Sequence, residues 1–128
     1  MAVDDFHLTV ASLTSSLALV SVSGELDLYT NERLQQGIEE ATSVGAETVL
    51  VDLSGVGFID STALGVIVQE SKRLEGRARS LRLVTNDPRT LRVLEVTGLD
   101  HVLRRYATLH DALADLVSPS GAAAVGLR

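Results

Sequence analysis

One short segment combines an acid, two hydroxyl groups and small residues: Asp60, Ser61, Thr62, Ala63, Leu64 and Gly65. It follows an apolar run and precedes a stretch whose apolar residues recur at helical spacing. Asp, Ser and Thr often cap helices, because their side-chain oxygens accept hydrogen bonds from the free backbone N–H groups of the first turn. One interpretation of the segment is therefore structural, as a helix cap.

Ser61 gives the same segment a second interpretation, as a phosphorylation site. A hydroxyl in the first turn of a helix lies beside free N–H groups and the positive end of the helix dipole, which together accept a phosphate. The added negative charge would stand near Asp60 and Asp27 and would change the local surface potential sharply. Thr62 is a second hydroxyl at the next position, about 100° further around the helix. The spacing of these residues alone does not distinguish a helix cap from a phosphorylation site.

Other site chemistries have little support in the sequence. His7, His101 and His110 lack paired metal-ligand spacing, and the chain has no cysteine. It contains neither the GxxxxGK[ST] nor the GxGxxG phosphate-binding pattern, and no GxSxG nucleophile elbow. We therefore expect no metal, no cofactor and no enzymatic activity.

A phosphoaspartate receiver domain is the closest competitor, because it is also a small domain of alternating strands and helices. Asp52 could serve as its acceptor. A receiver domain also needs a lysine late in the chain, however, and the only lysine here is Lys72, inside a predicted helix. This hypothesis is therefore disfavoured.

The length and composition of the chain indicate a single globular domain. The chain of 128 residues fits one domain, with 45% hydrophobic and 22% charged residues, as in ordinary globular proteins. No apolar run approaches the ~18 residues that a membrane-spanning helix needs. Asp4 and Asp5 stand where a secretory signal would be basic and then apolar. We expect a cytoplasmic protein without a membrane partner.

The net charge of −6 is unevenly distributed. Residues 1–60 hold ten acids and only one basic residue, Arg33, whereas residues 61–128 carry a formal charge of +3. The acidic excess and the absence of Trp argue against nucleic-acid binding. The acidic half is either a solvated face or a docking surface for a protein. We interpret the basic run from Lys72 to Arg82 as a complement to a helix dipole. We interpret Phe58 as a core residue, the alternative being that it frames the docking surface.

The hydrophobic pattern predicts how these residues are positioned. Two strands form a hairpin, and helices and strands then alternate, which requires parallel crossover connections. We expect strands over 6–12, 17–22, 48–53, 81–84 and, weakly, 101–105, and helices over 31–45, 61–76, 88–98 and 109–117. Residues 24–30 and 54–57 are interpreted as a break and a loop.

The predicted fold class is α/β: a single domain with a mixed four- to five-stranded sheet, an N-terminal hairpin and flanking helices. The domain covers 1–117, and 118–128 form a flexible tail. Asp27 and Ser61 should lie at the same end of the sheet, because each follows a strand and precedes a helix.

Three motifs give the chain a family resemblance. The segment Val51–Val68, VDLSGVGFIDSTALGVIV, resembles the hallmark of STAS domains, specifically bacterial anti-sigma factor antagonists. Gly24–Asp27, GELD, is similar to an element before the family's first helix, and Leu94–Leu99, LEVTGL, resembles the end of a late helix. The resemblance covers about residues 6–117 and implies the fold predicted above.

The resemblance also implies a function. In that family the unphosphorylated antagonist binds an anti-sigma factor that is also a serine kinase, and a sigma factor is released. Phosphorylation of the serine after the motif aspartate ends binding, and a serine phosphatase restores it. By position Ser61 is the acceptor, Asp60 flanks it and Asp27 lies beside it, while Thr62, Leu64 and Gly65 complete the phosphosite-flanking, partner-binding segment.

Two points stay open at the level of sequence. The alternative is a non-catalytic STAS scaffold, or a regulatory domain that binds a small ligand or nucleotide. The chain also has Ala63 where the family usually has glycine, and this methyl group could obstruct close approach by the kinase.

Overall fold

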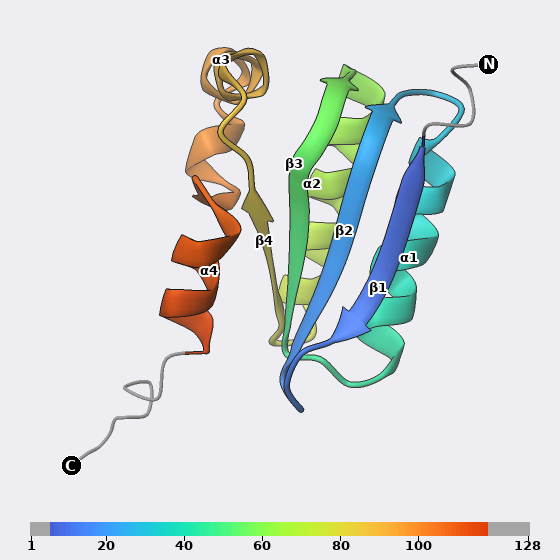
Figure 1. Cartoon of the computed structure of the whole chain (residues 1–128), viewed down its shortest axis with the longest axis vertical. Helices are drawn as coiled ribbons and strands as arrows, with labels where there is room; N and C mark the ends of the chain where they lie inside the picture. The colour runs from blue at the N-terminus through green and yellow to red at the C-terminus, as the bar shows by residue number, and fades with distance from the viewer. Residues whose placement is uncertain (1–5, 118–128) are drawn as a thin grey trace.

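The computed structural model describes residues 6–117 and contains one five-stranded sheet with the strand order β1-β2-β3-β4-β5 (Figure 1). β1 pairs antiparallel with β2, and every other neighbouring pair is parallel. The elements are β1 (His7–Ser12), β2 (Leu17–Leu26), α1 (Asn31–Ser43), β3 (Thr48–Ile59), α2 (Ser61–Glu75), β4 (Ser80–Val84), α3 (Pro88–Thr97), the 3₁₀ turn η2 (Leu99–His101), β5 (Arg104–Tyr106) and α4 (Leu109–Leu116). The predicted fold class, including the N-terminal hairpin, is confirmed.

The sheet separates two hydrophobic clusters, because alternate residues of a strand face opposite sides. On one side, Val49 and Val51 of β3 pack in the main core with α1 and α2, which lie together against that face in Figure 1. On the other side, Leu50 joins Val84 and Ala112 in a smaller cluster beneath α4. α4 therefore covers the face opposite to α1 and α2.

β2 and β3 are both longer than the sequence predicts. The expected break at 24–30 begins only after Leu26, and the expected loop at 54–57 is part of β3. The two strands stay paired here with irregular register, for example Ser23 with Gly55. A Cβ on Gly55 would lie 2.8 Å from the Cβ of Ser23, so glycine permits this close approach. The glycines that suggested a loop instead extend the sheet.

The later elements agree better with prediction. Asp87 caps α3 by accepting a hydrogen bond from the Arg89 backbone N–H at 2.9 Å, and Pro88 is the first helical residue. This hydrogen bond is the largest cause of a lowered Asp87 pKa. Gly98 ends α3 in the left-handed region, with φ of 78°. The predicted strand at 101–105 is wrong over 101–103, because His101 ends η2 and a turn follows it. β5 comprises Arg104–Tyr106.

The predicted tail, 118–128, lies outside the described residues, and its flexibility stays a prediction. Within residues 6–117, none of the helices combines the length and the apolar character required to cross a bilayer.

Candidate functional site

The candidate site lies at the end of the sheet where the neighbouring strands β2 and β3 have their carboxyl ends. Leu26 and Ile59 are register partners, and the backbone N–H of Asp60 donates to the Leu26 carbonyl oxygen at 3.0 Å. Asp27 and Ser61 each follow one of these paired strand ends. The prediction that they share one end of the sheet is confirmed.

Asp60 supplies the cap of α2. Its backbone is extended, with φ of −100° and ψ of 175°, and its Oδ1 accepts a hydrogen bond from the Ala63 backbone N–H at 2.9 Å. Ser61 is the first residue of the helix and is exposed. Its hydroxyl makes no hydrogen bond with any residue of the described range 6–117. The capping role therefore belongs to Asp60, and the Ser61 hydroxyl has no structural role of this kind.

The next four residues of the motif divide between surface and core. Thr62 and Gly65 are exposed, whereas Ala63 and Leu64 are buried. Because the Ala63 methyl group points into the core, the expectation that it obstructs a kinase at the surface is wrong. Leu64 is only 2% exposed, so its main contacts are within the protein. A Cβ added to Gly65 would meet nothing within 4 Å, which leaves this backbone open to close approach.

A shallow groove extends from Ser61 along α2. It has a volume of about 610 Å³ and runs between α2 and α3. Ser61 and Thr62 line it at the start of α2, and Lys72 lines it three turns later. Most of its other lining residues are apolar: Leu64, Val66, Val68, Val93 and Leu99. A group attached to Ser61 would stand at one end of an apolar surface.

Asp27 organises the turn between β2 and α1. Its Oδ1 accepts hydrogen bonds from the backbone N–H groups of Tyr29 at 2.9 Å and Thr30 at 3.2 Å. The Thr30 hydroxyl in turn donates to the carbonyl oxygen of Glu25 at 2.7 Å. The carboxylate therefore shapes the turn and also places negative charge at the strand end shared with Ser61.

Three exposed apolar side chains near this edge were not predicted as functional. Leu28 is 66% exposed and Tyr29 is 87% exposed, both in the turn that Asp27 organises. Phe58 is 49% exposed and pairs with Glu25, so its assignment to the core is wrong. The signal for Leu28 and Tyr29 was present in GELDLYT, since apolar residues within a tight turn cannot reach the core. We name Leu28, Tyr29 and Phe58 the turn patch.

Replacing Asp27 tests its charge separately from its hydrogen bonds. Asp27→Asn keeps an Oδ1 acceptor for the turn, so we expect an unchanged midpoint of thermal unfolding but altered phosphorylation or partner binding. Asp27→Ala removes the acceptor and should destabilise the fold by about 1 kcal/mol. Circular dichroism melts and a binding titration with the purified partner measure the two effects. If Asp27→Asn binds and is phosphorylated normally, Asp27 has only its structural role in the turn.

A metal centre has no support in this part of the chain. Across residues 6–117 there is no group of three or more His, Asp or Glu residues that could hold a metal ion.

The site consists of an exposed hydroxyl at a helix start, acidic neighbours, an apolar groove and the turn patch. These are features of a protein-binding surface that a modification could alter.

Comparisons with known proteins agree on one family. The STAS domain family profile matches residues 10–112. The anti-sigma-F factor antagonist RsfB of Mycobacterium tuberculosis is 33% identical over 112 residues, which are 88% of this chain and 90% of that protein. An anti-sigma factor antagonist structure from Mycobacterium paratuberculosis has a TM-score of 0.79 and 31% identity, covering 90% of this chain and 97% of that one.

A further solved structure extends the likeness of fold. The Bacillus cell fate determinant SpoIIAA, in its phosphorylated form, has a TM-score of 0.68 and 22% identity, covering 86% of this chain and 99% of that chain. At this level of identity the likeness concerns the fold alone.

Proposed function

The chain belongs to the STAS domain family, and from this membership and the site geometry we propose that it is an anti-sigma factor antagonist controlled by phosphorylation of Ser61. The unphosphorylated form binds an anti-sigma factor, which is also its serine kinase, and thereby frees a sigma factor. A serine phosphatase returns the phosphorylated form to the binding state. In this proposal the protein is a non-catalytic regulator, and it acts in the cytoplasm, where its kinase has access to ATP.

One observation carries this proposal: the Ser61 hydroxyl is exposed at the start of α2, while Asp60 already caps the helix. A serine that served as the cap would lose its hydrogen bond on modification. Ser61 has no such bond within residues 6–117. An enzyme can therefore modify this exposed hydroxyl without breaking a hydrogen bond that stabilises the fold.

The reaction needs little from this chain beyond presentation of the hydroxyl. The kinase transfers the γ-phosphoryl group of ATP: the Ser61 Oγ–P bond forms, the P–O bond to ADP breaks, and the hydroxyl proton is released to a base. The backbone N–H groups of the first helical turn and the helix dipole favour the resulting dianion. Asp60 and Asp27 oppose it electrostatically, which makes the charge change large at the surface.

The turn patch and the groove supply the binding surface on either side of Ser61. Apolar and aromatic side chains carry much of the energy of protein interfaces, and Tyr is enriched among the dominant residues. The acidic residues Glu25, Asp27 and Asp60 near this edge favour a partner with a basic rim. This arrangement supports a partner that contacts both strand ends and the first turns of α2.

The acceptor assignment is tested by mapping the phosphate. Incubated with ATP and the kinase captured from its native cytoplasm, the protein should gain one phosphoryl group, on Ser61, as measured by intact-mass and peptide mass spectrometry. Ser61→Ala should gain none, whereas Thr62→Ala, the matched control at the other exposed hydroxyl, should be modified normally. Phosphate on Thr62, or a normal rate in Ser61→Ala, would contradict the assignment.

The same capture experiment separates the switch from the alternative of a scaffold or ligand-binding STAS domain. A switch should release its captured kinase when ATP is present, because phosphorylation ends binding. Capture that is identical with and without ATP, with no modification of Ser61, would favour the scaffold.

A further inference from the structure

A second pocket lies at the free edge of the sheet and shares no lining residue with the groove beside Ser61. It has a volume of about 600 Å³, within the range of about 300–1,000 Å³ that small-molecule sites occupy. Its polar lining includes Arg82, Arg104, Arg105 and His101, with Asp100 and Asp115 as the acids. In a chain of net charge −6, this concentration of arginines is unexpected.

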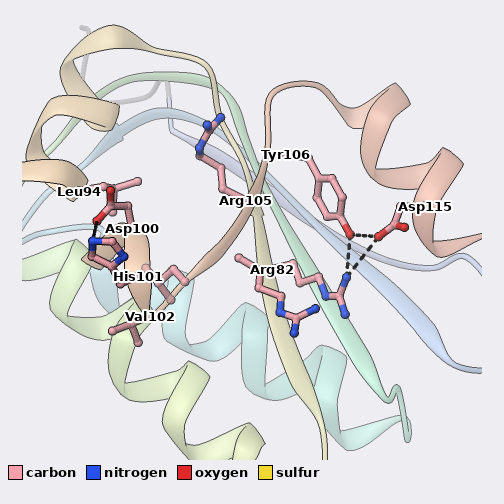
Figure 2. A pocket seen from close by; sticks show the side chains of 10 residues that line it. Arg82, Leu94, Asp100, His101, Val102, Arg105, Tyr106 and Asp115 are labelled. Carbon is pink, nitrogen blue, oxygen red and sulfur yellow. Dashed lines mark hydrogen bonds and ion pairs between the residues drawn. The ribbon is translucent and has the colours of Figure 1, made fainter. Parts of the chain in front are cut away.

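The Arg82 side chain uses only one of its three nitrogens, Nη1, in hydrogen bonds with the described residues. Its Nη1 donates to the Tyr106 hydroxyl oxygen at 2.7 Å and to Asp115 Oδ2 at 3.4 Å (Figure 2). The Tyr106 hydroxyl donates to the same Asp115 oxygen. Burial, and then the hydrogen bond to Asp115, raise the pKa of Tyr106 above its ordinary value, so the hydroxyl stays protonated at neutral pH. Tyr106 and Asp115 therefore act as positioning residues for Arg82.

The other edge of this guanidinium is unpaired. Arg82 Nε is buried and has no hydrogen-bond partner in the described part of the chain, and no hydrogen bond there uses Nη2. The Nε–Nη2 edge is one of the two-donor edges with which arginine binds carboxylates and phosphates side-on. A buried charged donor without a partner is unfavourable, and an anion would supply one.

Arg104 brings a second positive charge to the same place. Arg82 and Arg104 are register partners on the adjacent parallel strands β4 and β5, so their side chains leave the same face of the sheet, with the strands about 4.8 Å apart. Arg104 is exposed, and its guanidinium makes no hydrogen bond or ion pair with the described residues 6–117. Two like charges opposite each other repel unless an anion lies between them. Arg105 is occupied elsewhere, donating to the Thr85 carbonyl oxygen at 3.0 Å.

We propose that Arg82 and Arg104 form a binding site for a phosphate-type oxyanion, either free or as the phosphoryl group of a small molecule. The anion accepts hydrogen bonds from the Nε–Nη2 edge of Arg82 and from the guanidinium of Arg104. Nε is covered in this structure, so binding through this edge includes a rearrangement of side chains around Arg82. The site is independent of Ser61 and would give the protein a second, ligand-dependent input.

The test is a titration of the full chain with inorganic phosphate, followed by nuclear magnetic resonance at constant ionic strength and pH. We expect saturable shifts of the Arg82 Nε–Hε signal and of the Arg104 and Tyr106 backbone amides. Arg104→Gln should weaken binding at least about tenfold, since it removes a charge-assisted contact. Arg77→Gln is the matched control, because it removes the same charge from an exposed arginine outside the pocket.

Arg82→Lys adds a check on geometry, because it keeps the charge but removes Nε, and it should also weaken binding. Its thermal unfolding reports whether α4 remains docked. Phenyl phosphate distinguishes the two sources of the anion: tighter binding than inorganic phosphate assigns the site to a phosphorylated small molecule, and equal binding assigns it to the free ion. Shifts that do not saturate, or that are equal in Arg104→Gln and the unsubstituted protein, overturn the site.

Discussion

Phosphorylation of Ser61 should weaken binding of the anti-sigma factor at least about a hundredfold. The phosphoryl group adds about −1.5 to −2 charges at neutral pH at an edge that already carries Asp27 and Asp60. Its hydration shell must be removed before a partner can pack against the groove, and removing a charge from water without pairing it costs several kcal/mol. Each 1.4 kcal/mol is tenfold in affinity, so about 3 kcal/mol gives the expected loss.

The loss should arise at the surface and leave the fold intact. Ser61 makes no hydrogen bond within residues 6–117 that modification would break, and the helix start accepts the phosphate. Ser61→Ala should therefore bind constitutively. Ser61→Asp should bind poorly, although it is an imperfect mimic with one charge and two oxygens.

Titration calorimetry with the purified anti-sigma factor measures these affinities, and circular dichroism of both forms checks the fold. Thr62→Asp adds one charge at the neighbouring exposed position, which also lines the groove, and therefore shows how strongly the loss of affinity depends on the position of the charge. Equal affinities for Ser61→Ala and the Ser61-phosphorylated protein would refute the switch. Unfolding of the phosphorylated form would refute local blocking as its mechanism.

Tyr29→Ala should reduce partner affinity by about ten- to thirtyfold, corresponding to about 1.4–2 kcal/mol. Tyr29 is 87% exposed in the turn that Asp27 organises, so its ring contributes little to the stability of the free protein. An exposed aromatic ring at the same end of the sheet as the phosphosite is expected to be buried in the complex, where its large area and polar hydroxyl both contribute.

Val44→Ala provides the control for this substitution. Val44 is 65% exposed at the carboxyl end of α1, near the start of β3 and therefore at the opposite end of the sheet. It should leave affinity unchanged, and both variants should keep the unfolding midpoint of the unsubstituted protein. If Tyr29→Ala and Val44→Ala bind equally well, the turn patch lies outside the interface.

The sequence by itself was sufficient for the elements with strong local signals. Asp87 and Pro88 predicted the start of α3, and Gly98 predicted its end, because capping and left-handed backbone are properties of a few adjacent residues. The alternating apolar residues of β1 and the apolar runs of β2, β3 and β4 predicted the mixed sheet. The shared location of Asp27 and Ser61 followed from the parallel connections alone.

The local glycine pattern was misleading where strands pair over a long distance. Residues 54–57 read as a loop because Gly55 and Gly57 are turn formers in isolation. In the folded chain β3 continues because Ser23 lies directly beside Gly55, a contact between residues far apart in sequence. Pairing with β2 therefore overrode the local preference.

The assignment of side chains to surface or core needed the tertiary structure most. Helical periodicity placed Ala63 and Leu64 on an apolar face, and the resemblance placed Leu64 in the partner-binding segment. The packing of α2 on the sheet shows that both residues are buried, while Ser61, Thr62 and Gly65 remain accessible. Likewise, Arg82 was grouped with a basic run that complements a helix dipole, although it falls within the predicted strand 81–84. The structure places it on β4, where its register partner is Arg104. Helical and strand periodicity fix which residues share a face, whereas the neighbouring elements decide which face is buried.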